Sequence, residues 1–372
     1  MNKKKQRYTP EQTAMHYGFD FAEIKESSGN KASGERAEEE KLKVLKYYTR
    51  AYDLKREIPK SMLFYNKPLI KEKGASAKAY TMGLDVIGVD NALAEAMVIQ
   101  TALSILKEEG YKDLCIELNS IGDKESVKRF EKELLTYYRE KSEILKAPER
   151  KKINQNEVMQ LFCSSKEYMQ EINEDAPKPI YFLSDESSSH FKEVLEYLEG
   201  AGLAYQINDS LMGHKNYFSK LIFTISGRSG KEKKSQILAR GGRYDELASQ
   251  TTRKRKISAV GLSMDFKRLP RANQISRKDV SIHLIKIGSN ARMKSLDILE
   301  AMKAACVPIY HSLDESKISQ QLEEAVANKA QYALIIGQQE ANRGKVLVRN
   351  METSAQDEVS VAELARYMKK VI

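Results

Sequence analysis

The sequence predicts an α+β fold in two domains: an antiparallel sheet with flanking helices within residues 1–272, and an α/β domain over 279–372. Residues 80–87 alternate between apolar and small or polar side chains, which is typical of an antiparallel sheet with one packed face. From Val280 onward, apolar runs alternate with segments of helical spacing, which indicates a small domain with a mixed sheet. A chain of 372 residues with 41% hydrophobic residues can form both cores.

The first fifty residues predict two helices and a loop. Thr9 to Ile24 has a threonine at the N-cap position and a proline in its first turn, so we expect a helix there. Lys25 to Glu40 is polar and rich in glycine and serine, which predicts a flexible loop. Lys41 to Leu54 places apolar residues near helical spacing and predicts a second helix.

The rest of the first domain alternates strands and helices. Asp90 and Asp123 each precede a run with helical spacing, so we expect both to cap helices. Residues 140–200 are rich in charge and helix formers and predict a helical excursion. The other expected strands are 62–69, 79–89, 113–119, 203–207 and 217–226, and the other expected helices are 91–109, the segment after Asp123, 191–198 and 261–269.

A linker at 270–277 precedes the second domain. Its expected strands are 280–287, 307–311, 332–337 and 345–349, and its expected helices are 290–305, 314–329 and 361–368.

Composition narrows the classes of function. The net charge of +10 favours a polyanionic partner such as RNA. The sequence has no run of 18 apolar residues, so we expect no membrane span. Its basic start is not followed by an apolar stretch, so we expect no secretory signal. Cys115, Cys163 and Cys306 lie far apart without CxxC spacing. They predict free thiols in the cytoplasm and no metal site.

Several segments, taken in order, resemble the histidyl-tRNA synthetase family of class II aminoacyl-tRNA synthetases. The segments are LMGHKNYFSKLIFTI, VIGVDNALAEAMVI, LCIELNSIGD, NQNEVMQLFCSSKE, GGRYDEL, SAVGLSMDFKRL and the run from DESKISQQ to VLVRNMET. The resemblance covers nearly the whole chain from Tyr17. It implies a class II synthetase-like antiparallel sheet, a C-terminal anticodon-binding-like domain, tRNA or another RNA as partner, and a homodimer.

The same resemblance identifies remnants of a substrate pocket. Asp85 stands at an acidic position of the family, and Thr81 stands where the family has a glutamine that orients histidine. The full set of remnant positions is Asp85, Thr81, Tyr217, Gly241, Gly242 and Arg268. Each residue type also suits a structural role. A strand aspartate can be solvated, for example, and strand glycines permit close backbone packing.

Other positions of the implied pocket have lost the family's chemistry. Phe64 and Gly213 are aligned with two arginines that act on the reacting phosphate and carboxyl groups, and Asn66 is aligned with a glutamate. Asp265 replaces a glycine of the third class II motif. Leu42 to Leu45 replaces the P-E-G-T segment that holds the amino group of histidine. A phenylalanine cannot supply the charged donors that a phosphate needs.

These departures favour a catalytically inactive paralogue that binds tRNA, another RNA or a protein partner and needs no cofactor. Two alternatives stay open: an active histidine–tRNA ligase with a divergent site, which would use ATP and Mg²⁺, and a regulatory subunit like that of ATP phosphoribosyltransferase. The basic run Arg253, Lys254, Arg255 and Lys256 is the candidate for phosphate contacts, although such runs are often only solvated loops.

Overall fold

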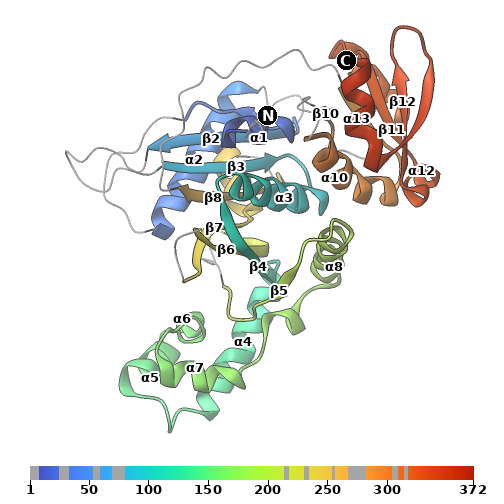
Figure 1. The fold of residues 1–372 in the computed structure, drawn as a ribbon. Coiled ribbons are helices and arrows are strands. Elements are labelled where there is room, and N and C mark those ends of the chain that lie inside the picture. Colours follow the sequence, from blue (N-terminus) through green and yellow to red (C-terminus); the bar gives the residue numbers. More distant parts are fainter. Residues whose placement is uncertain are drawn as a thin grey trace.

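The structure, a computed structural model, describes residues 8–24, 33–52, 59–68, 80–212, 218–229, 234–253, 256–266, 282–303, 309–313 and 317–372. Two sheets organise these residues (Figure 1). The first has eight strands in the order β1-β2-β3-β8-β7-β6-β4-β5, and the second has five in the order β10-β9-β11-β12-β13.

The first sheet is antiparallel except at its two edges, where β1 pairs with β2 and β4 pairs with β5 in parallel. This confirms the predicted antiparallel architecture. Its strands are β1 (Asp20–Phe21), β2 (Ser61–Pro68), β3 (Tyr80–Ile87), β4 (Tyr111–Gly122), β5 (Tyr205–Ile207), β6 (Ser219–Ser229), β7 (Gln236–Arg243) and β8 (Ala259–Phe266).

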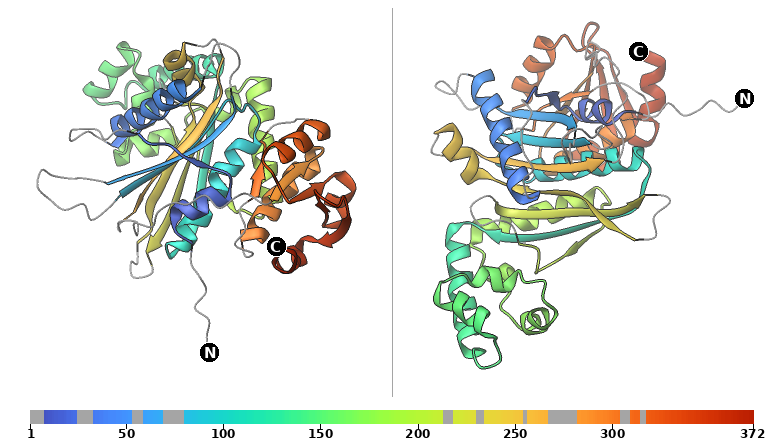
Figure 2. Two further views of the ribbon diagram at one scale, coloured as in Figure 1. Left: turned by 90° about the horizontal axis from the view of Figure 1, so that it is seen from above. Right: turned by 90° about the vertical axis from the view of Figure 1, so that its left-hand side faces the viewer.

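Helices cover both faces of this sheet, as the left view of Figure 2 shows. One face packs against α3 (Leu93–Glu108), α1 (Pro10–His16) and α8 (Asp185–Gly200), which share the large core cluster with the sheet. The opposite face packs against α2 (Ser33–Ala51) and α9 (Asp245–Thr252) through a separate apolar cluster. Both faces of the central strands are therefore buried, and β3 is buried along its whole length, so the single packed face predicted for residues 80–87 is wrong.

The predicted helical excursion is confirmed. It extends from the end of β4 as a group of helices with its own apolar core, at the bottom of Figure 1. Its elements are α4 (Lys124–Glu140), α5 (Ala147–Asn154), α6 (Val158–Phe162), α7 (Glu167–Glu174) and the 3₁₀ helix η1 (Pro179–Phe182), after which α8 returns the chain to the sheet.

The second sheet is mixed, as predicted: β10, β9 and β11 are parallel, and β12 and β13 are antiparallel. Its strands are β9 (Ile282–Lys286), β10 (Ile309–His311), β11 (Tyr332–Ile336), β12 (Lys345–Asn350) and β13 (Gln356–Ser360). Its helices are α10 (Ser289–Lys303), α11 (Ile318–Ala327), α12 (Gln338–Arg343) and α13 (Val361–Val371).

Helix α10 joins the two units because it packs against α3. The side chain of Gln100 donates to the carbonyl of Leu296 at 3.1 Å, and Lys303 Nζ donates to Ser104 Oγ at 2.6 Å. The apolar core is continuous across this contact.

Four further local predictions are wrong. The first helix ends at His16 and is followed by β1, because Gly18 adopts a positive φ of 90° that turns the chain. Residues 33–40, expected in a loop, belong to α2, whereas 25–32 lie outside the described residues. Residues 261–266, expected in a helix, belong to strand β8 between β3 and β7.

Asp90, the fourth, does not cap α3. Its carboxylate lies 3.5 Å from Arg243, 3.4 Å from Lys256 and 3.9 Å from Lys220. The expected caps Thr9 and Asp123 are confirmed. Among the described helices, none is long and apolar enough to cross a membrane.

Candidate functional site

Among the described residues, Thr81, Asp85 and Gly242 lie on the face of the first sheet that α2 covers, whereas Gly241 points to the opposite face. Strand pairing places Thr81 between Lys67 and Asp265, and it places Asp85 between Leu63 and Gly261. Directly paired residues of an antiparallel sheet point to the same face, and alternate residues of one strand do the same. Thr81, Asp85 and Asp265 are therefore brought together with Lys67.

Asp85 is fully buried and is held by two side chains. Lys41 Nζ lies 2.6 Å from Asp85 Oδ1, and the hydroxyl of Tyr244 donates to the same oxygen at 2.7 Å. Lys41 Nζ also donates to the carbonyl of Leu262 at 3.0 Å. Burial raises the pKa of the Asp85 carboxyl, whereas Lys41 and Tyr244 act in the opposite direction. Lys41 is itself only 2% exposed, so this ion pair lies inside the protein.

The residue before Lys41 makes a second buried polar cluster on the same face. Glu40 Oε2 accepts hydrogen bonds from the hydroxyls of Tyr65 at 3.0 Å and Ser263 at 3.1 Å, and Glu40 Oε1 lies 2.5 Å from Lys67 Nζ. Two consecutive residues of α2 thus place a carboxylate and an ammonium group on neighbouring rows of the sheet.

The remaining described pocket positions are also engaged within the chain. Thr81 Oγ1 donates to Asp265 Oδ1 at 2.6 Å. Gly242 lies against the ring of Phe218, since a Cβ at Gly242 would come within 2.7 Å of it. Gly241 faces the ring of Phe223 in the same way, at 2.5 Å. Both glycines are needed for close packing, which agrees with the structural role that strand glycines can have.

Phe64 and Asn66 do not join this group, which corrects their place in the predicted pocket. Phe64 pairs with Leu84 and packs into the core on the α3 face, and Asn66 Nδ2 donates to Glu11 Oε1 at 2.7 Å. Because side chains alternate along a strand, both point away from Asp85. Lys67 is the basic residue of β2 that faces the pocket.

Leu42 to Leu45 lies within α2, where Val44 and Leu45 are buried in the apolar cluster that α2 shares with the sheet. Gly213, Tyr217, Lys254, Arg255 and Arg268 lie outside the described residues. Arg253 and Lys256 are exposed at the end of α9 and beyond it, as surface contacts require. Sequence reasoning missed Glu40 and Lys41, because they were assigned to a loop and to the start of a helix.

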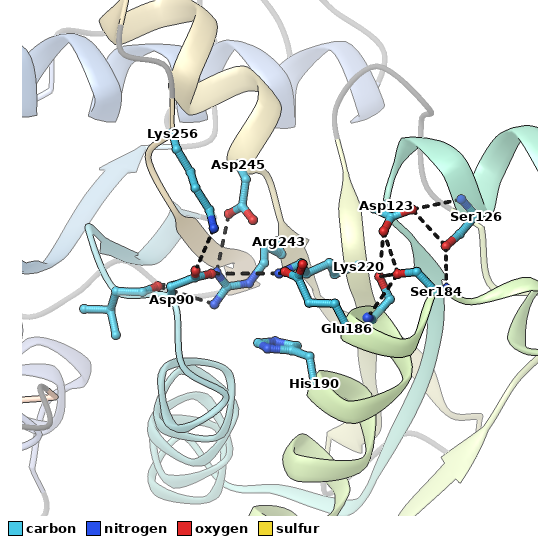
Figure 3. Close-up of polar contacts among 12 residues, drawn as sticks. Asp90, Asp123, Ser126, Ser184, Glu186, His190, Lys220, Arg243, Asp245 and Lys256 are labelled. Carbon is cyan, nitrogen blue, oxygen red and sulfur yellow. Dashed lines mark hydrogen bonds and ion pairs between the residues drawn. The ribbon is translucent and has the colours of Figure 1, made fainter.

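A separate cluster of buried charged residues, away from the pocket, lies at the end of β7 (Figure 3). Arg243 is fully buried, and its Nε and NH2 donate to the two carboxylate oxygens of Glu95 at 2.8 and 3.1 Å. His190 Nε2 lies 2.6 Å from Glu95 Oε1. Burial would raise the pKa of Glu95, but Arg243 and His190 outweigh it and hold that pKa far below its usual value. The cluster joins the sheet to α3 and α8, so its role is structural.

Figure 3 also shows Asp123 with Ser126 and Ser184, beyond Lys220 and Glu186. Lys220 Nζ lies 3.1 Å from Glu186 Oε1, and Asp123 Oδ2 accepts from Ser184 Oγ at 2.6 Å. These contacts fix the start of the helical excursion against the start of α8.

Comparisons with known proteins agree with this architecture. A family model described as "Histidyl-tRNA synthetase" matches residues 61–269, and one described as "Anticodon binding domain" matches residues 279–371. The chain is 25% identical over 317 residues to a histidine–tRNA ligase of Bacillus subtilis, covering 82% of this chain and 74% of that protein. It is 28% identical over 307 residues to the histidine–tRNA ligase of Vesicomyosocius okutanii, covering 80% and 72%.

A solved structure of apo histidyl-tRNA synthetase from S. aureus has a similar fold. The TM-score is 0.54 at 19% sequence identity, and the match covers 96% of this chain and 93% of that one.

Proposed function

Since this chain belongs to the histidyl-tRNA synthetase family, we propose that it is a non-catalytic member that binds tRNA or another RNA and does not form histidyl-adenylate. The single observation that carries the proposal is the buried ion pair between Lys41 and Asp85. It supports the proposal because the side chains that would face a substrate are already bound to another part of the same chain.

The described residues do not fit ATP and histidine at this place. Asp85 is fully buried and forms an ion pair with Lys41. Lys67 forms an ion pair with Glu40, and Thr81 donates a hydrogen bond to Asp265. Adenylate formation needs cationic donors where negative charge develops on the phosphate. On this face, Lys41 and Lys67 are instead neutralised by the carboxylates of Asp85 and Glu40.

The C-terminal unit supports RNA as the partner. It matches an anticodon-binding family over almost its whole length, and the chain carries a net charge of +10. Basic proteins bind nucleic acid chiefly through phosphate contacts. Arg253 and Lys256 are exposed and belong to the proposed contact surface.

The proposal extends to assembly and location. We propose a homodimer in the cytoplasm, where free thiols such as those of Cys115 and Cys163 persist. Light scattering at micromolar concentration tests the dimer, and a monomer under those conditions contradicts it. A protein partner takes the place of RNA if RNA binding fails.

The second candidate function is an active, divergent histidine–tRNA ligase. The curated relatives named above carry that activity in their names, and Lys67 lies on the pocket face where a basic group could act. A ligase would require α2 to withdraw Glu40 and Lys41 from the sheet before substrates bind. A regulatory role like that of the ATP phosphoribosyltransferase subunit is the third candidate, and no contact among the described residues favours it.

Histidine-dependent pyrophosphate exchange separates the first two functions, because it measures adenylation without tRNA. We expect no exchange above background from a sample whose folding is confirmed by circular dichroism. Exchange within about tenfold of ordinary enzyme turnover, roughly 1–10³ s⁻¹, would establish the divergent ligase instead. A matched sample of an active histidine–tRNA ligase serves as the positive control.

A further inference from the structure

We propose that the cage around Lys41 Nζ is a receptor for a primary ammonium group and that Lys41 is its resident ligand. The inference rests on the proposed function and deepens it, since it says what keeps the pocket closed. The receptor is built by β3, β8 and Tyr244, whereas the ligand is supplied by α2. Receptor and ligand are therefore separate parts of the fold.

The contacts of Lys41 Nζ are those that recognise an ammonium group. Asp85 Oδ1 supplies a negative charge at 2.6 Å, and the carbonyl of Leu262 accepts a hydrogen bond at 3.0 Å. The ring centroid of Tyr244 lies 5.6 Å away, within the range of a cation–π contact. An ammonium group has three donors and no acceptor, and it is attracted to the face of an aromatic ring. The cage matches these properties.

The strands themselves are shaped for this carboxylate. A Cβ on Gly261 would come within 2.1 Å of Asp85 Oδ1, so only glycine lets the carboxylate lie across β8. Asp85 Oδ2 is buried and has no hydrogen-bond partner within the described parts of the chain, so the carboxylate can accept a further donor. The sheet therefore keeps a preformed acceptor site that Lys41 uses only in part.

The neighbouring Glu40 sets the direction from which the ligand enters. Its carboxylate is bound by Lys67, Tyr65 and Ser263, one row along the sheet from Asp85. A Cβ on Gly83 would come within 2.2 Å of the Tyr65 ring, so this glycine makes room for the tyrosine that holds Glu40. Together Glu40 and Lys41 fix α2 on the sheet and seat the ammonium in the cage.

The test replaces the lysine by a free amine. In Lys41→Ala, the atoms removed beyond Cβ correspond to n-propylammonium. We expect the Tm to fall by roughly 5 °C, because one partner of a buried pair is lost. Added n-propylammonium chloride is then expected to raise the Tm in a saturable manner. Tetramethylammonium chloride at the same ionic strength is expected to have no such effect, because it cannot donate hydrogen bonds.

Two variants act as controls. Lys43→Ala removes a lysine of the same helix that pairs with Glu39 near the surface at 3.1 Å, so no amine-dependent rise is expected. Lys41→Met keeps the volume of the side chain without its charge and leaves little space for an amine, so it also should not respond. If Lys41→Ala does not fold, the refolding yield in n-propylammonium is compared with that in tetramethylammonium.

A folded Lys41→Ala protein with no saturable response, an equal response to both cations, or equal refolding yields in both would overturn the inference. These readouts do not involve nucleotide or RNA. Failure of the receptor therefore leaves the exchange assay to decide the proposed function, and exchange by the unmodified protein contradicts the proposed function without altering the thermal data.

Discussion

Arg243 shows how strongly single residues depend on their partners in this protein. Among the residues that the structure describes, it is the largest fully buried side chain, and Glu95 balances its charge with two hydrogen bonds. Removing one member of such a pair leaves an uncompensated charge in the interior, which costs far more than the pair contributes. The same logic applies to Asp85 and Lys41, where a lone carboxylate would remain in the sheet.

Replacing Arg243 by methionine is expected to lower the free energy of unfolding by about 3–5 kcal/mol. The matched control is Lys192→Met, which removes an exposed lysine 3.8 Å from Glu196 and is expected to cost about 0–1 kcal/mol. Urea unfolding at pH 7 measures the free energy of unfolding of both single variants. The double change Glu95→Gln with Arg243→Met is expected to recover part of the loss. Equal costs for the two single variants would contradict the buried-pair argument.

At the scale of elements, the helical excursion depends on how α4 begins. Asp123 is the N-cap of α4 and accepts from the backbone N–H groups of Glu125 and Ser126, at 3.0 and 2.9 Å. It also accepts from Ser184, the N-cap of α8. One carboxylate thus ties together the first and last long helices of the excursion. Burial opposes ionisation, but the donors, Ser184 foremost, lower the pKa of Asp123 to about 2.

Asp123 predicts a pH-dependent contribution to stability. A carboxylate whose pKa is lowered by folding stabilises the protein fully above its unfolded pKa, about 3.9. That contribution is lost as pH falls through about 2. We expect Asp123→Asn to be less stable than the parent at pH 6, with the difference shrinking between pH 4 and pH 2 in urea unfolding. Asp175→Asn, at the C-cap of α7, is the control. A difference that does not change with pH would contradict the proposed role of the charge.

At the scale of the whole molecule, the two sheets are joined through α10 and α3, and the C-terminal unit therefore has a defined place. Lys303 contributes to this contact twice, since its Nζ lies 2.6 Å from Ser104 Oγ and 3.0 Å from Glu108. Tyr17 and His311 make a further contact, in which the His311 ring nitrogen lies 3.0 Å from the Tyr17 carbonyl oxygen. An RNA bound to the C-terminal unit would therefore face a protein whose two units are held together by these contacts.

RNA binding is expected to be dominated by phosphate contacts, so its affinity should fall steeply between about 50 and 200 mM salt. Filter binding of tRNA across this range measures the slope. The double change Arg253→Ala with Lys256→Ala is expected to reduce the slope by roughly one to two. Lys192→Ala on α8 removes a lysine that lies outside the proposed basic run and is expected to leave the slope unchanged. No retention of RNA at low salt would favour a protein partner instead.

The fold class, the helical excursion and most strands can be predicted from the amino-acid order, because apolar periodicity and capping residues act over short distances. Thr9 and Asp123 were recognisable as caps for this reason. Residues 261–266 were misassigned because a strand buried on both faces has no alternating pattern to distinguish it from a buried helix. Residues 33–40 form a helix despite their polar sequence because Glu40, with the residues that follow, packs on the sheet.

The residues that meet in the pocket depend on how strands and helices pack together. Asp85 and Thr81 were identifiable from the sequence, but which face each strand residue occupies depends on strand register, which placed Lys67 beside them and Phe64 on the other side. Lys41 is 44 residues from Asp85 in the chain, and their contact is created by the packing of α2 on the sheet. Such long-range pairing of charges follows from packing and leaves no local pattern in the sequence.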